Sequence, residues 1–268
     1  MCTLTIVPVA GGPDRTLRFR VVFNRDERRN RRPGEAPRLR RVAGRTAIWP
    51  LDPAGGGTWI AVNESGLVFS LLNRTPNGDG KTWLGPDPNA KSRGRLIPAL
   101  VASDSLESIA NRIRSASEGI TRGFRLVVTD GRRILEAEGG LDQVAVPVLR
   151  SLDGAFFRTS SSLGDDLVFE PRRRLFVERF GSWLEGPAAD ASSARTVQDQ
   201  FHQSTFEGRG EISVSMTRAD ARTVSATCVE VHDDRIVVAH RDGGPAAPIS
   251  KHLEWPTATS QSSLEASS

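Results

Sequence analysis

Cys2 follows the initiator methionine directly and is one of only two cysteines in 268 residues. An initiator methionine is commonly removed when the next residue is small, and its removal here would make Cys2 the first residue. Cys2 would then carry both a thiol and a free α-amine, whose ordinary pKa of about 8 leaves part of it unprotonated near neutral pH. A single residue would supply the nucleophile and the base for attack on a carbonyl.

Two predicted strands determine where Cys2 lies. Residues 2–9 and 17–23 have the composition of buried strands, and the Gly-Gly-Pro-Asp turn between them predicts an antiparallel hairpin. A hairpin centred near Pro13 pairs residues whose numbers sum to about 26, so Cys2 should face Asn24. The segment Asn24–Glu27 is therefore expected beside the N-terminus.

That segment offers suitable chemistry. Asp26 could accept a hydrogen bond from the α-amine and orient it. Arg25 could lower the thiol pKa and hold an anionic group of a substrate. The alternative is an ordinary surface ion-pair cluster at the end of a strand.

The rest of the sequence predicts an α+β protein with mostly antiparallel sheets. Loop residues dominate from Pro33 to Gly57, and Pro171 is expected to open a helix. The other expected helices are residues 105–116, with Asp104 as N-cap, and residues 193–201. The expected hairpins are 59–62 with 67–72, 124–129 with 132–137, and 224–232 with 235–240. Residues 1–242 form one domain, and the Ala-, Ser-, Pro- and Thr-rich tail 243–268 is expected to be disordered.

Composition narrows the functional classes. The net charge is +4 and arginine is dense between Arg25 and Arg45, but acidic residues are interspersed and aromatic residues are missing from that run. A nucleic-acid partner is therefore not expected. No apolar run could span a membrane, no secretory signal is visible, and two cysteines do not make a disulfide framework. We expect a cytoplasmic protein whose partner is a small-molecule substrate or ligand.

Two motifs make the sequence similar to a known family. Phe23-Asn-Arg-Asp-Glu-Arg28 follows Cys2 at a characteristic distance, and Gly56-Gly-Thr-Trp-Ile-Ala-Val-Asn-Glu-Ser-Gly-Leu67 leads into Leu71-Leu72-Asn73. Together they resemble the NRDE family, also called Transport and Golgi organisation 2-like proteins. The resemblance covers roughly residues 1–240. It implies an N-terminal nucleophile hydrolase fold, a four-layer αββα sandwich distantly related to bile-salt hydrolases and penicillin V acylases.

The more distant group implies roles for further residues. Its oxyanion-binding asparagine corresponds to Asn73, and a second oxyanion asparagine corresponds to Ser161 in Thr159-Ser-Ser-Ser162. A hydroxyl reaches less far than an amide, so this substitution weakens the expected site. That group also has an arginine far along the chain, which corresponds here to Arg218 or Arg222. Arg222 is favoured because Thr223 and a strand follow it, as in the family pattern.

Two functions fit these residues, and neither requires a cofactor or a metal. The first is hydrolysis of a linear amide bond through an acyl-enzyme on Cys2, with Asp26, Asn73 and Arg222 as catalytic residues and Asn24, Arg25 and Ser161 binding substrate or tuning the nucleophile. The alternative is a non-catalytic protein that binds or carries a small ligand such as haem or a lipid, as eukaryotic members of the family are linked to. The four histidines show no metal-ligand spacing, and Cys228 is expected to be a buried apolar residue.

Overall fold

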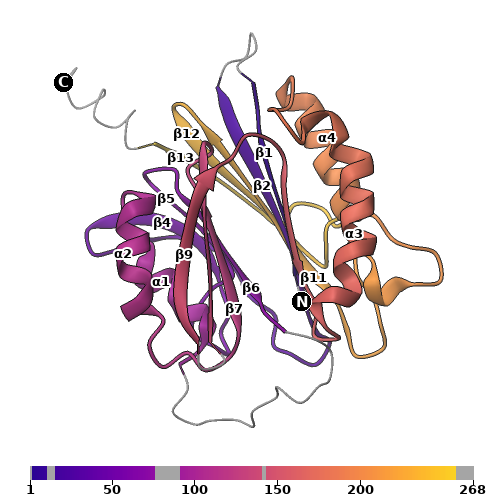
Figure 1. Cartoon of the computed structure of the whole chain (residues 1–268), viewed down its shortest axis with the longest axis horizontal. Helices are drawn as coiled ribbons and strands as arrows, with labels where there is room; N and C mark the ends of the chain where they lie inside the picture. Colours follow the sequence, from indigo (N-terminus) through magenta and orange to yellow (C-terminus); the bar gives the residue numbers. More distant parts are fainter. Residues whose placement is uncertain (1, 11–15, 76–90, 141–142, 258–268) are drawn as a thin grey trace.

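Two antiparallel sheets are packed face to face in the computed structural model, which describes residues 2–10, 16–75, 91–140 and 143–257 (Figure 1). Sheet I has the strand order β10 (Phe156–Ser160), β1 (Cys2–Pro8), β2 (Leu17–Arg28), β11 (Ala221–His232), β12 (Arg235–Asp242) and β13 (Lys251–Pro256). Sheet II has the order β3 (Glu35–Val42), β4 (Arg45–Leu51), β5 (Ile60–Asn63), β6 (Val68–Asn73), β7 (Phe124–Thr129), β8 (Arg133–Gly140) and β9 (Gln143–Ser151).

Helices cover the outer face of each sheet. α1 (Leu96–Leu100) and α2 (Leu106–Ala116) pack on sheet II, and α3 (Asp165–Phe180) and α4 (Ala191–Gln203) pack on sheet I (Figure 1). Three short 3-10 helices, η1 (Arg93–Arg95), η2 (Gly181–Trp183) and η3 (Gly210–Ile212), complete the structure. The expected four-layer αββα sandwich is confirmed. No helix in the described part of the chain is long and apolar enough to cross a membrane.

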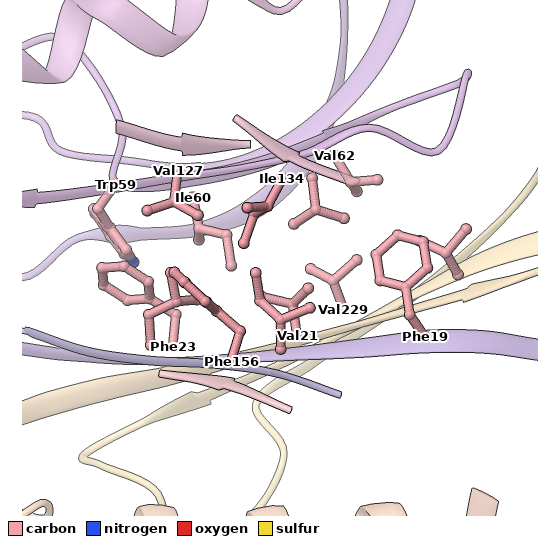
Figure 2. Packing of buried hydrophobic residues seen from close by; sticks show 14 of the residues in the cluster. Phe19, Val21, Phe23, Trp59, Ile60, Val62, Val127, Ile134, Phe156 and Val229 are labelled. Atoms are coloured by element: carbon pink, nitrogen blue, oxygen red, sulfur yellow. The ribbon is translucent and has the colours of Figure 1, made fainter. Parts of the chain in front are cut away.

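Strand alternation explains why the central strands are apolar on both faces. Leu4 and Ile6 of β1 enter the core between the sheets, while Val7 joins the core beneath α3 and α4. Figure 2 shows the inter-sheet core, where aromatic and β-branched side chains from both sheets interdigitate. Trp59, Phe23 and Phe156 lie close together in it (Figure 2).

Several sequence predictions are confirmed. The helix at 105–116 is α2, and the hairpins β5–β6, β7–β8 and β11–β12 lie where they were expected. The predicted register of β1 and β2 is wrong by one residue, because Cys2 pairs with Arg25 and Thr3 pairs with Asn24. The predicted turn at Gly11–Asp14 lies outside the described residues.

Other predictions are wrong. The presumed loop before Gly57 contains β3, whose partly exposed, Arg-rich positions obscure the alternation, and β4, which is almost entirely buried. The tail is not disordered throughout, because residues 251–256 form β13, whose Leu253 and Trp255 pack against the inter-sheet core. Residues 258–268 lie outside the described part of the chain.

Two helix boundaries also differ. The N-cap of α2 is Ser105, which accepts a hydrogen bond from the Ser108 N–H, rather than Asp104. α3 begins at Asp165, after Gly164 with its φ of 110°, and not at Pro171. Pro171 has no N–H for the carbonyl of Leu167, but Leu167 lies on an exposed turn where water can bond to that carbonyl.

Candidate active site

Cys2 opens β1 between two neighbouring strands. It pairs with Arg25 of β2 on one side and with Ser160 of β10 on the other. Residues directly opposite in an antiparallel sheet share a face, and alternation along β1 puts Cys2 on the face of Leu4 and Ile6, toward sheet II. The Cys2 residue is only 7% exposed. Its thiol therefore lies at the end of the inter-sheet core.

Ser160 is the hydroxyl that faces this thiol. Its side chain is completely buried, and its Oγ has no hydrogen-bond partner in the described part of the chain. A buried hydroxyl without a partner costs free energy, on the order of 1–3 kcal/mol, so it is conspicuous beside a nucleophile. Sequence reasoning missed Ser160, because three consecutive serines give no indication of which one shares the face of Cys2.

Ser161, the predicted residue, is used differently. Its Oγ accepts a hydrogen bond from the Leu163 N–H at 3.0 Å, and its own N–H donates to Asp165 Oδ1 at 2.8 Å. These bonds shape the turn from β10 into α3. The structure thus brings Ser160, not Ser161, to the face of the Cys2 thiol.

Asp26 lies beside Cys2 but its carboxylate faces the helix layer. Thr223 donates a hydrogen bond to its Oδ1 at 2.6 Å, and Arg172 lies 4.0 Å from its Oδ2. Burial raises the pKa of the Asp26 carboxyl, whereas the charges of Arg172 and Arg218 lower it. The backbone N–H of Asp26 forms a hydrogen bond with the thiol of Cys2. Asp26 is therefore adjacent to Cys2, as the sequence predicted.

Arg172 of α3 compensates this buried carboxylate. The guanidinium is fully buried and donates to Thr3 and Thr159 side chains and to two backbone carbonyls, at distances of 2.6–3.0 Å. Thr3 and Thr159 flank the strand ends that carry Cys2 and Ser160, so Arg172 fixes both strands from the helix side. Nothing in the sequence distinguished it from the arginines that follow it.

The surroundings of the Cys2 thiol raise its pKa overall. Burial is the largest influence on Cys2 and raises its pKa, while the Asp26 N–H and Arg25 lower it by less. The charge of Arg25 lowers the thiol pKa, as expected from the sequence, but burial outweighs it. Arg25 lies on the thiol face with its guanidinium 4.2 Å from the Trp59 ring centroid, and it forms an ion pair with Glu27 at 3.4 Å.

Asn24 is not part of this face. It is fully buried on the opposite side of β2, where its Nδ2 donates to the carbonyls of His202 and Val214. Its position fixes the end of α4 on sheet I. The predicted role of Asn24 in substrate binding or thiol tuning has no support in the structure.

Asn73 ends β6, which lies across the interior from β1 and β10. Asp165 connects the two strand ends, because it accepts hydrogen bonds from the Thr75 N–H at 3.2 Å and from the Ser161 N–H at 2.8 Å. Asn73 therefore reaches the same end of the sandwich as Cys2. Its side chain is half-buried, and its pairing with Phe124 puts it on the face of sheet II that α1 and α2 cover rather than on the face toward Cys2. Its role as an oxyanion donor stays a prediction.

The two candidate arginines lie on neighbouring backbone segments but differ in burial. Arg222 is exposed and pairs with Glu27 in the β2–β11 register. Arg218 is largely buried, donates to Ser162 Oγ at 3.2 Å and lowers the pKa of Asp26. The geometry favours Arg218 over the predicted Arg222 as the arginine that acts on the site.

A further cation comes from η1. Arg93 donates to the Gly123 carbonyl at 2.9 Å, and burial together with Arg122 lowers its pKa to about 10, with the charge on Cys2 acting in the opposite direction. Gly57 holds η1 in place, since a Cβ at Gly57 would lie 2.1 Å from the Gly94 backbone. The Gly56–Trp59 motif thus holds in place the segment that carries Arg93, which its turn-like composition did not reveal.

A thiol at the start of a central strand, in an αββα sandwich, defines the class of the N-terminal nucleophile hydrolase folds. The chain belongs to the Transport and Golgi organisation 2 family, whose model matches residues 1–148. A search of curated proteins found no match.

Solved structures with a similar fold include the *N*-acylethanolamine-hydrolyzing acid amidase orthologue of Caenorhabditis elegans, at 11% identity and a TM-score of 0.49, covering 85% of this chain and 92% of that one. The C2A mutant of the conjugated bile acid hydrolase from Clostridium perfringens matches at 10% identity and a TM-score of 0.45, covering 97% of this chain and 93% of the other.

Proposed function

We propose that this chain is a cysteine amidohydrolase that cleaves a linear carbon–nitrogen amide bond through an acyl-enzyme on Cys2. The observation that carries the proposal is the pairing of Cys2 with Ser160, which places a buried thiol and a partnerless hydroxyl on one face of neighbouring strands. The proposal assigns the Oγ of Ser160 to the developing oxyanion. Asn73, the predicted second donor, would have to turn from its place beside Phe124 to contribute its side-chain amide.

The base is the α-amine of Cys2, released by removal of Met1. Cys2 pairs with Arg25 in an antiparallel register. The backbone nitrogen of Cys2 therefore lies on the side of Asp26, the residue that follows Arg25. The Asp26 carboxylate is held by Thr223 and Arg172, so it can accept a hydrogen bond from the amine and keep it oriented. Retention of Met1 would convert this nitrogen to an amide, which is no base.

The reaction proceeds in two balanced steps. The neutral amine takes the thiol proton, and Sγ attacks the amide carbonyl to form a tetrahedral oxyanion. Collapse breaks the C–N bond, the ammonium returns its proton to the leaving nitrogen, and a thioester remains on Cys2. Water then attacks the thioester with the amine as base, which releases a carboxylic acid and regenerates the thiol.

Thiol labelling tests this proposal, and Cys228 is an internal control. Burial raises the pKa of the Cys228 thiol to about 11, so it should react slowly with iodoacetamide. Intact mass first establishes loss of Met1. Cys2 should then label faster than Cys228 in the folded protein, with a rate that depends on the ionisation of its amine.

A matched variant distinguishes the contribution of the α-amine to labelling from that of the thiol. Insertion of one alanine between Met1 and Cys2 keeps the thiol and displaces the amine by one residue, and it should slow labelling at Cys2 to the rate at Cys228. Equal rates at both cysteines in the natural protein after Met1 removal would contradict the proposal. In that case the buried, protonated thiol would favour the non-catalytic ligand-binding alternative, which a haem titration followed by absorbance can examine.

A further inference from the structure

The charged side chains at the end of the sandwich where β1 begins carry an excess of positive charge. Arg25 and Arg31 each pair with Glu27 at 3.4 Å. The same two arginines also approach Asp52, at 3.8 Å and 2.6 Å respectively. These two cations and two carboxylates neutralise one another, so any further arginine at this end is in excess.

Arg93 of η1 and Arg122, which precedes β7, are such arginines. In the described part of the chain neither of them forms an ion pair with a carboxylate. Burial and the charge of Arg122 lower the pKa of Arg93 to about 10. The charges of Cys2 and Glu27 act in the opposite direction, so both groups lie within electrostatic range of the Arg93 guanidinium.

A hydrogen bond holds the guanidinium of Arg93 at the end of β6. Its Nη1 donates to the carbonyl of Gly123 at 2.9 Å, and the same carbonyl accepts the N–H of Arg74, the residue that follows β6, at 3.0 Å. The side chain is half-buried and has no other hydrogen bond in the described part of the chain. Four of the five N–H bonds of an arginine are therefore free to bind a ligand.

The residue that follows connects this arginine to the neighbours of the thiol. The Gly94 carbonyl accepts a hydrogen bond from the Thr58 N–H at 2.9 Å. The next residue, Trp59, has its ring 4.2 Å from the guanidinium of Arg25, and Arg25 pairs with Cys2. The unpaired arginine is thus fixed at the same end of the sandwich as the thiol.

A purely structural role does not account for the charge of Arg93. One hydrogen bond to a carbonyl requires a donor but no charge, whereas a half-buried guanidinium without a counter-ion costs free energy. The planar fork of an arginine matches the two oxygens of a carboxylate, and such a pair is stronger than a neutral hydrogen bond. A carboxylate from a ligand would supply the counter-ion that Glu27 and Asp52, already shared by two other arginines, do not.

We infer that the substrate whose amide is cleaved at Cys2 also carries a carboxylate, and that Arg93 binds this carboxylate. The inference rests on the proposed hydrolysis, because it names the substrate class of that reaction. Arg122 is exposed and attracts the same anion from solution.

Phenylacetate and phenylacetamide form a matched pair of probes, because they have nearly the same shape and differ in charge. The full chain with Cys2→Ala cannot form an acyl-enzyme, so titration calorimetry on it measures binding alone. Phenylacetate should bind at least about tenfold more tightly than phenylacetamide, a preference that corresponds to about 1.4 kcal/mol.

Three changes in the Cys2→Ala chain test the role of Arg93. Arg93→Gln should abolish the preference for phenylacetate, and Arg93→Lys should keep part of it, because a lysine retains the charge without the fork. Arg95→Gln is the matched control, since Arg95 is an exposed arginine of the same 3-10 helix, and it should leave the preference unchanged.

Equal affinities for the two probes, or a preference that survives Arg93→Gln, would overturn the inference. The comparison of the two probes in the Cys2→Ala chain stands even if an Arg93 variant fails to fold. Failure of the hydrolysis has a different signature, because the carboxylate preference would then persist while the natural protein forms no acyl group on Cys2. Acylation of Cys2 without any carboxylate preference would refute the inference alone.

Discussion

Ser160 stands directly across from Cys2 in the pairing of β10 with β1, and its buried hydroxyl has no hydrogen-bond partner in the described part of the chain. Folding normally satisfies such groups, and a fully buried hydroxyl that lacks a partner is often accounted for by function. The neighbouring Ser161 is already engaged by Leu163. The two serines therefore have different roles, and substitution separates them.

Ser160→Ala should slow acylation of Cys2 by about tenfold or more, because one oxyanion donor is lost. The free energy of unfolding should rise, by up to about 1–3 kcal/mol, because alanine removes a buried hydroxyl that makes no bond in the folded state. Ser161→Ala should do the reverse and lower the stability by about 1 kcal/mol with little effect on acylation, through loss of the bond from the Leu163 N–H. Urea unfolding and acylation kinetics on both variants provide the comparison. Equal losses of activity would contradict the assignment.

Arg172→Met should destabilise the protein by about 3–5 kcal/mol, because it removes a buried guanidinium that lies beside the Asp26 carboxylate and donates to Thr3 and Thr159. Arg174→Met is the matched control on the same helix, where the side chain is 77% exposed and pairs with Glu170. That change should stay within about 0.5 kcal/mol. Denaturant unfolding measures both. A small effect at Arg172 would show that Asp26 does not need this partner.

Arg218 and Arg222 can be told apart by the pH dependence of Cys2 labelling. The charge of Arg218 lowers the pKa of Asp26, so Arg218→Gln should raise that pKa and shift the acid limb of the labelling profile to higher pH. Arg222→Gln removes an exposed side chain and should leave the profile in place. A shift caused by Arg222→Gln alone would restore the sequence-based assignment.

Acid stability should depend on Glu230. Hydrogen bonds from Arg195 and His232 and the charge of Arg20 outweigh burial and lower its pKa in the folded state. The unfolded chain then binds the proton more readily, so the stabilisation is complete above about pH 5 and is lost as the pH falls. Glu230→Gln should reduce stability at pH 7 by about 1.5–3 kcal/mol and the difference should shrink toward pH 2, whereas Glu178→Gln, at an exposed site, should change neither. A difference that persists unchanged at pH 2 would refute this origin.

The sequence predicted the position of Cys2 well for a local reason. β1 and β2 follow each other closely in the sequence, so the error in their register was one residue and Asp26 was still placed beside Cys2. It was harder to predict which face of the sheet each side chain occupies. The alternation along β2 directs Asn24 to α4 and Arg25 to the thiol. A one-residue shift in register changes which side chains share a face.

The sequence did not reveal contacts between residues that are far apart along the chain. Ser160 meets Cys2 only through the pairing of β1 with β10, and Arg172 meets Asp26 only after α3 packs on sheet I. β3 was missed because arginines occupy its exposed positions and Pro37 interrupts it, and β4 was missed because it is short and contains Pro50. β13 was missed because its short alternating segment is embedded in a tail of disorder-prone composition.

The acyl-enzyme itself is the most direct measurement of the central claim. The protein with Met1 removed is mixed with *p*-nitrophenyl acetate, quenched in acid and digested, and the acetylated peptide is located by mass spectrometry, with Cys2→Ala as control. The account predicts a burst of *p*-nitrophenol and an acetyl group on Cys2 that decays as water attacks, with neither in Cys2→Ala. Absence of the Cys2 adduct, or an equal burst from Cys2→Ala, would contradict it.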